Sequence, residues 1–222
     1  EIVNNTDRVT RGDRELWEEL LQVVIPKGRN IWAFADDDSE KLNEVGRSFE
    51  FFVLPENNEA NVKKAMKDGN FFAASKYYKT TDGVGDFDGD GNVPLVTGIK
   101  VDQKANTITV ATDPTRDCRV IEWIADGKVI ATGNTIDLND YEKDLGCYIR
   151  FQMKGSGGVT YSQPFELQYK GRIDKPVPSW ALWVFKTEAG QKFMKFYHSH
   201  SFALGALIAE KIRILIEDNI KK

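Results

Sequence analysis

Six short β-rich runs, separated by Gly, Asn and Asp, fill the middle of this chain and limit what it can fold into. Short strands broken by turn residues at this spacing are typical of antiparallel sandwiches. Asp126-Gly127 is a hairpin signal between two of the runs. We therefore predict an antiparallel β-sandwich over residues 81–170. The six runs are 98–101, 107–111, 119–125, 128–131, 148–153 and 164–168.

The first 80 residues follow a different pattern, in which helix-like and strand-like segments alternate. Apolar residues at helical spacing extend to Val24 behind Asp13, which we expect to be the N-cap. Asn58 and Gly69 bracket a second helix as its N-cap and its C-terminal glycine. This order predicts part of an α/β domain over residues 1–80. Two buried strands are predicted within it, at 30–35 and 49–54.

The last part of the chain, residues 171–222, is expected to be a helical tail. A Pro-containing stretch at 175–178 separates it from the strands, and residues 204–216 carry a broad apolar stripe at helical spacing. For the whole chain the predicted fold class is α+β: a partial α/β region, an antiparallel β-sandwich and a C-terminal helix.

Composition excludes several classes of partner. The chain has 222 residues, with 30 basic against 34 acidic side chains and a net charge of -4, so no nucleic acid is expected as a partner. No stretch reaches the roughly 18 uninterrupted apolar residues of a membrane-spanning helix. Cys118 and Cys147 lack Cys-x-x-Cys spacing, and we predict two small buried thiols, with a disulfide between them as the alternative.

A run of acids follows the first predicted strand directly, from Asp36 to Asp38 and on to Glu40. Strand ends in α/β sheets face the crevice where such folds bind ligands, and carboxylate oxygens suit hard cations. A solvated acidic turn is the alternative interpretation of the same run.

A second group of acids lies in the Gly-rich segment 82–92. Asp86, Asp88 and Asp90 match the first carboxylate positions of a calcium loop, and Asn92 could add its backbone carbonyl. The match ends there, because no bidentate glutamate or flanking helix follows. We weigh a structural calcium loop against a polar hairpin tip that binds nothing.

Several segments together resemble a known family. They are Glu1-Ile-Val-Asn4, Trp17-Glu-Glu-Leu-Leu21, residues 31–40, residues 61–75, Gly146-Cys-Tyr-Ile-Arg150 and Ser162-Gln-Pro164. In order and spacing, over residues 1–170, they resemble the later half of the PHP (polymerase and histidinol phosphatase) superfamily of metal-dependent phosphoesterases. The resemblance implies that residues 1–80 are a remnant of a PHP-barrel-like domain and that the chain is a C-terminal fragment.

The resemblance also implies a metal centre. The family's Asp-x-His pair falls on Asp38-Ser39-Glu40, so Asp38 is kept and Glu40 stands where the family has histidine. The other family ligands would precede Glu1. An intact parent would use manganese, iron or zinc to hydrolyse a phosphorylated small molecule, whereas we expect the fragment alone to be inactive.

Other features leave the function and location open. His198 and His200, the two histidines of the chain, are expected in a helix-entry loop rather than at a metal. The alternative function is a non-catalytic, calcium-stabilised β-sandwich that binds a surface glycan or protein. Self-association is expected if the partial α/β region leaves a sheet edge uncovered. The compartment, cytoplasmic or secreted, is left open.

Overall fold

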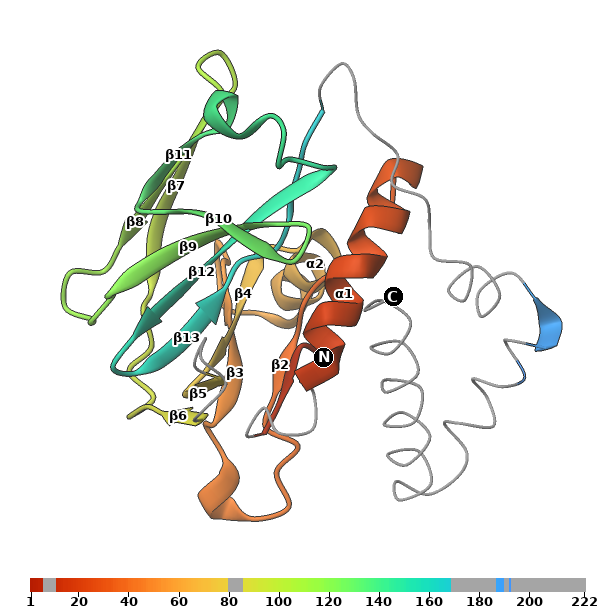
Figure 1. The fold of residues 1–222 in the computed structure, drawn as a ribbon. Coiled ribbons are helices and arrows are strands. Elements are labelled where there is room, and N and C mark those ends of the chain that lie inside the picture. The colour runs from red at the N-terminus through yellow and green to blue at the C-terminus, as the bar shows by residue number, and fades with distance from the viewer. Residues whose placement is uncertain (6–10, 80–85, 169–186, 190–191, 193–222) are drawn as a thin grey trace. The chain divides into compact units, whose positions relative to one another are not determined.

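The computed structural model describes residues 1–5, 11–79, 86–168, 187–189 and 192 (Figure 1). The chain divides into two compact units, Glu1–Asp174 and Lys175–Lys222, and the elements named below belong to the first. This unit has the α+β character expected from the sequence, with mostly antiparallel strands and two α-helices among the described residues. The helix expected at 204–216 lies outside the described residues.

A small parallel layer opens the fold. β1 (Val3–Asn4) and β2 (Ala35–Asp36) pair in parallel and are connected through α1 (Arg11–Val24) and the 3-10 turn η1 (Ile25–Lys27). The helix buries Trp17 and Leu21 against the two strands, and the indole Nε1 of Trp17 donates to the carbonyl of Ile31 at 2.7 Å. Asp13 lies in the first turn of α1, so the prediction that it is the N-cap is wrong.

The edge of β2 that faces away from β1 is closed by side chains. Gln163 accepts from the backbone N–H of Ala33 at 2.8 Å and donates to its carbonyl at 2.9 Å, and a Glu50 carboxylate oxygen accepts from Ala35 N–H at 2.8 Å. These contacts occupy the positions that a neighbouring strand would take. The run expected at 49–54 is therefore not a member of the parallel layer.

That run instead belongs to a large antiparallel sheet. Its strands, in spatial order, are β10 (Lys128–Thr132), β9 (Val120–Ala125), β12 (Tyr148–Gly155), β13 (Gly158–Tyr161), β4 (Phe71–Ser75) and β3 (Ser48–Phe52), and β14 (Phe165–Glu166) pairs beside β12. Strands from both sides of the boundary expected near residue 80 thus share one sheet and one compact unit.

A second sheet packs against this one and completes a sandwich. It contains β11 (Thr135–Asp137), β8 (Thr107–Thr112) and β7 (Val96–Asp102). Ile108 and Val110 of β8 contact the buried side chains of Trp123 and Phe151 from the large sheet in one core cluster. The expected hairpin at Asp126-Gly127 joins β9 to β10, with both residues at positive φ.

β12 separates the two cores of the unit. Ile149, Phe151 and Met153 belong to the core of the sandwich, whereas Tyr148 belongs to the cluster that includes Trp17 and Leu21 of α1. Side chains alternate between the two faces of a strand, so β12 serves both clusters at once. The large sheet therefore packs against the three-stranded sheet on one face and against the parallel layer with α1 on the other (Figure 1).

α2 (Glu59–Asp68) has the ends that the sequence predicts. The Asn58 side chain accepts from a backbone N–H of the first turn, and Gly69 ends the helix at φ 75°. The Trp32 ring lies against this glycine, where an added Cβ would come within 2.7 Å of the ring. Only glycine fits both the left-handed conformation and the packed ring.

The remaining short elements are loops and caps. They are β5 (Tyr77–Lys79), β6 (Asp86–Asp88), η2 (Leu42–Glu44) and η3 (Leu138–Tyr141). Cys147 is buried as predicted, whereas Cys118 is half-buried, and neither of these two cysteines is in a disulfide in the described part of the chain. Among the described residues, no helix is long and apolar enough to cross a bilayer.

Candidate functional site

The C-terminal ends of β1 and β2 form the first candidate site, because parallel strands end at the same edge. The Asn4 side chain there donates to Glu1 at 2.9 Å and to the Asp38 carboxylate at 3.4 Å. Asp38 is exposed and has φ 45°, in the left-handed region that a non-glycine residue seldom adopts. The turn after β2 thus holds Asp38 beside the end of β1.

Two further carboxylates near this edge are partly removed from water. Burial, followed by the negative charge of Glu1, raises the pKa of Asp36, and Asp37 and Asp38 add to the rise. Burial also raises the pKa of Glu50, although the hydrogen bond from Ala35 N–H opposes the shift. Negative charge therefore gathers here from residues of three separate segments.

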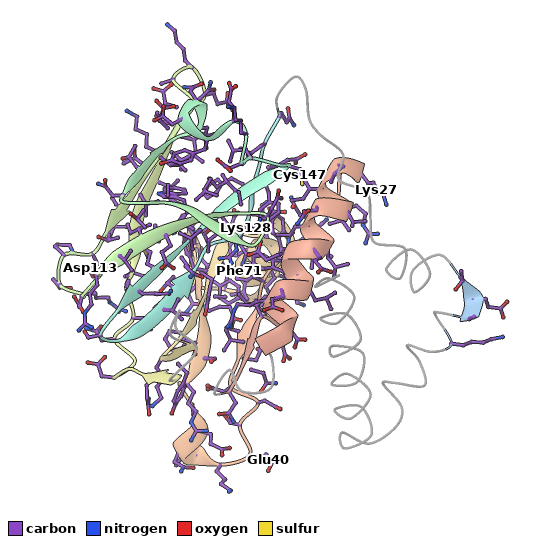
Figure 2. The ribbon with its side chains drawn as sticks, in the orientation of Figure 1. Lys27, Glu40, Phe71, Asp113, Lys128 and Cys147 are labelled. Atoms are coloured by element: carbon purple, nitrogen blue, oxygen red, sulfur yellow. The ribbon has the colours of Figure 1, made fainter. Side chains whose placement is uncertain are left out.

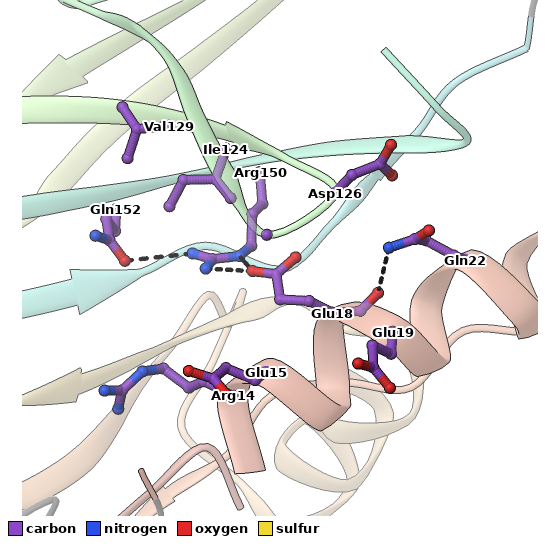
Figure 3. Close-up of a pocket in the computed structure, with 11 residues that line it drawn as sticks. Arg14, Glu15, Glu18, Glu19, Gln22, Ile124, Asp126, Val129, Arg150 and Gln152 are labelled. Atoms are coloured by element: carbon purple, nitrogen blue, oxygen red, sulfur yellow. Dashed lines mark hydrogen bonds and ion pairs between the residues drawn. The ribbon is translucent and has the colours of Figure 1, made fainter. Parts of the chain in front are cut away.

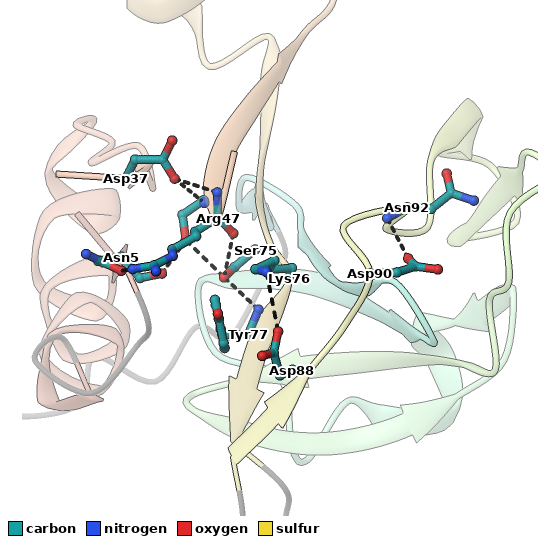
Figure 4. Close-up of polar contacts among 10 residues, drawn as sticks. Asn5, Asp37, Arg47, Ser75, Lys76, Tyr77, Asp88, Asp90 and Asn92 are labelled. Carbon is teal, nitrogen blue, oxygen red and sulfur yellow. Dashed lines mark hydrogen bonds and ion pairs between the residues drawn. The ribbon is translucent and has the colours of Figure 1, made fainter. Parts of the chain in front are cut away.

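Asp37, between these acids, organises the backbone. Its carboxylate accepts from the N–H groups of Gly46, Arg47 and Ser48 at 2.5, 2.6 and 2.7 Å, which ties the end of β2 to the start of β3. The Arg47 guanidinium in turn donates to the Asn5 side chain at 2.6 Å (Figure 4). The middle acid of the run is thus used for structure.

Glu40, the other residue predicted from the family resemblance, lies in the loop that leads to η2. Its side chain is exposed (Figure 2), and its backbone N–H donates to Glu44 at 3.0 Å. In the part of the chain that the structure describes, no three His, Cys, Asp or Glu side chains converge closely enough to hold a metal ion. Asp38 and Glu40 alone do not make up a centre.

The second predicted site, the acidic Gly-rich loop, extends from β6. Asp88 is paired with the Lys76 ammonium at 3.5 Å, and the Asp90 carboxylate accepts from Asn92 N–H at 2.8 Å within its own turn (Figure 4). The side chain of Asp86 lies outside the description. Asp88 and Asp90 are therefore engaged in different local contacts.

Glycines in this loop have a packing role of their own. A Cβ on Gly89 would come within 2.3 Å of the backbone carbonyl of Gly157, and Gly91 donates its N–H to that carbonyl at 3.0 Å with φ 87°. The loop thus lies backbone to backbone on the β12–β13 hairpin. This close approach accounts for the Gly-Asp-Gly pattern without reference to calcium.

A pocket of about 420 Å³ opens between α1 and the β9–β10 hairpin (Figure 3). At its wall the buried Arg150 guanidinium pairs with the buried Glu18 carboxylate and lies over the Trp17 ring at 5.3 Å. The Tyr148 hydroxyl donates to the other oxygen of Glu18, and burial followed by that carboxylate raises the pKa of Tyr148. Glu18, Arg150 and Tyr148 satisfy one another and fix α1 to the sheet.

Sequence reasoning found part of this arrangement. Asp36–Asp38 are expected at a strand end and lie there. Gln163 enters the sequence analysis only within the family resemblance and Glu50 not at all, so neither contact with the edge of β2 is predicted. A lone acid within the apolar run 49–54 was a signal that Glu50 has a specific partner. His198 and His200 lie outside the described residues.

Comparisons with known proteins identify no relative of this chain. The chain matches no protein-family model, no curated protein and no solved structure.

Proposed function

We propose that this chain is the C-terminal part of a PHP-type metal-dependent phosphoesterase, in which Asp38 is one ligand of the metal centre. The supporting observation is the shared C-terminal edge of β1 and β2, where Asn4 contacts Asp38 at 3.4 Å. Ligands of α/β folds bind at such strand ends. The sequence resemblance over residues 1–170 supplies the family.

The residues at this edge have distinct parts in the proposal. In an intact centre these residues would help to hold a divalent ion, which would supply Lewis acidity for phosphoester hydrolysis. Asp38 would be the oxygen donor, with Asn4 orienting its carboxylate, and Glu40 would be the second donor in place of the family's histidine. Of the three metals that the resemblance implies, carboxylate oxygens favour manganese.

The described residues do not fit a complete centre, because no three metal-ligating side chains converge among them. We therefore assign no hydrolytic step to this chain alone. Purified chain assayed with Mn²⁺ and p-nitrophenyl phosphate should give no metal-dependent turnover above blank. Turnover that Asp38→Asn abolishes would contradict this prediction.

Paramagnetic broadening by Mn²⁺ tests the proposed ligand directly, because it detects weak binding in the intact chain. Backbone amide signals of residues 35–40 should broaden first, and Asp38→Asn should remove the effect. Asp140→Asn, which changes an exposed acid in η3, is the matched control and should leave it unchanged. Broadening centred on Asp88 and Asp90 would instead favour the calcium-stabilised binding module, and uniform broadening would overturn both proposals.

A further inference from the structure

β7 is an outer strand of the sandwich. Among the described residues it pairs with β8 alone, so one side of its backbone has no neighbouring strand. Such an edge presents N–H and C=O groups to any chain that can extend the sheet.

The apolar side chains of β7 point toward the interior and yet are open to water. The register places Ile99 opposite Val110 and Val101 opposite Ile108, so each pair lies on the same face of the sheet. Val110 and Ile108 are 1% and 2% exposed, whereas Ile99 and Val101 are 38% and 50% exposed. The core-facing side of the sandwich is therefore uncovered along this strand.

We propose that a second copy of this chain covers the edge by antiparallel pairing of β7 with β7, with Val101 opposite Val101 of the second copy. In this register Lys100 lies opposite Asp102 of the second copy, twice over by symmetry. Shifting the centre to Lys100 would oppose two lysines, and centring on Ile99 would oppose Lys100 to Gly98. Charge complementarity thus selects one register of the strand with itself.

Asp102, the acidic residue of this contact, has its side chain fixed by local hydrogen bonds. One carboxylate oxygen of Asp102 accepts from the N–H groups of Lys104 and Ala105 at 3.0 and 2.9 Å, which fixes the side chain at the end of β7. The same hydrogen bonds, that from Ala105 being the stronger influence, lower the pKa of Asp102. The carboxylate therefore stays charged, and its second oxygen takes no part in these bonds.

Sedimentation equilibrium of the full chain tests the proposal. A reversible dimer is expected with a micromolar or weaker dissociation constant, since one strand pair buries little area. Val101→Lys should leave a monomer with an unchanged melting temperature, because residue 101 is exposed. Lys128→Glu on β10, also exposed, is the control and should still dimerise.

Exchange of charges tests the register. Lys100→Glu should weaken the dimer on the order of tenfold, because two opposite-charge contacts become like-charge contacts. Mixing Lys100→Glu chains with Asp102→Lys chains should restore association, because every cross-strand pair is then of opposite charge. A chain that stays monomeric to about 1 mM, or a dimer that survives Val101→Lys, would overturn the proposal, as would mixed variants that fail to associate while each melts cooperatively.

Discussion

The outer edges of β2 and β7 border the same unit but differ in how their backbone groups are satisfied. At β2, Gln163 and Glu50 take the place of a strand, whereas β7 has no such side chains among the described contacts. Ala33 and Ala35 are at most 1% exposed, so water cannot satisfy their N–H groups and protein must. The exposed backbone groups on the outer edge of β7 can instead form hydrogen bonds with water or with another chain.

The largest expected effect is on the attachment of α1, which covers the layer that contains β2. Glu18→Ala leaves the Arg150 guanidinium buried without its carboxylate and should lower the free energy of unfolding by about 3–5 kcal/mol. Chemical denaturation measures the change. Glu15→Ala, at an exposed position of the same helix, is the control. A loss below about 1 kcal/mol would show that the pair behaves as a surface contact.

Gln163→Leu tests the closed edge itself. The substitution keeps the side-chain size but leaves the N–H and the carbonyl of Ala33 unpaired, which should cost about 2–4 kcal/mol of unfolding free energy. Amide hydrogen exchange at Ala33 should accelerate more than that at Val101. Gln103→Leu, in the exposed turn after β7, serves for comparison, and equal losses at both sites would refute the distinction between the edges.

Glu50→Gln should have the smallest effect, and it separates the hydrogen bond from the charge. The amide oxygen can still accept from Ala35 N–H, so stability at pH 7 should change by less than about 1 kcal/mol. Because burial raises the folded-state pKa of Glu50 above its ordinary value of 4.5, the native protein binds more protons than the unfolded chain just above that value. Wild-type stability should therefore fall as the pH rises through this window.

The variant should lose this part of the pH dependence. Melting temperatures between pH 4 and pH 7 measure it, with Glu142→Gln at an exposed site as the control. A steeper slope in Glu50→Gln than in wild type would contradict the assigned cause.

Local signals in the sequence predicted the elements whose determinants are local. Asn58 and Gly69 bound α2 as expected because a cap acts within its own turn, and the Asp126-Gly127 hairpin follows from two residues. β4 is not among the strands that the sequence predicts within residues 1–80, because its strand character comes from pairing with β3 and β13.

The candidate site divides in the same way. The position of Asp38 after a strand could be predicted from the apolar run before it. The contact between Gln163 and Ala33 joins residues 130 positions apart, and no local pattern encodes it. The hydrogen bonds from Gly46 and Arg47 to the Asp37 carboxylate likewise depend on how the following loop folds back, which the run of acids does not encode.

The contact of Gln163 with β2 also sets an order on biosynthesis. β1, α1 and β2 leave the ribosome before the strands of the sandwich, but the Gln163 amide that completes the edge of β2 emerges only after most of the sandwich has been translated. Until then the backbone N–H and carbonyl of Ala33 have no Gln163 side chain to bond with on the nascent chain. The layer that is translated before the sandwich thus completes its native contacts only after the sandwich, and chaperone protection during translation would matter most there.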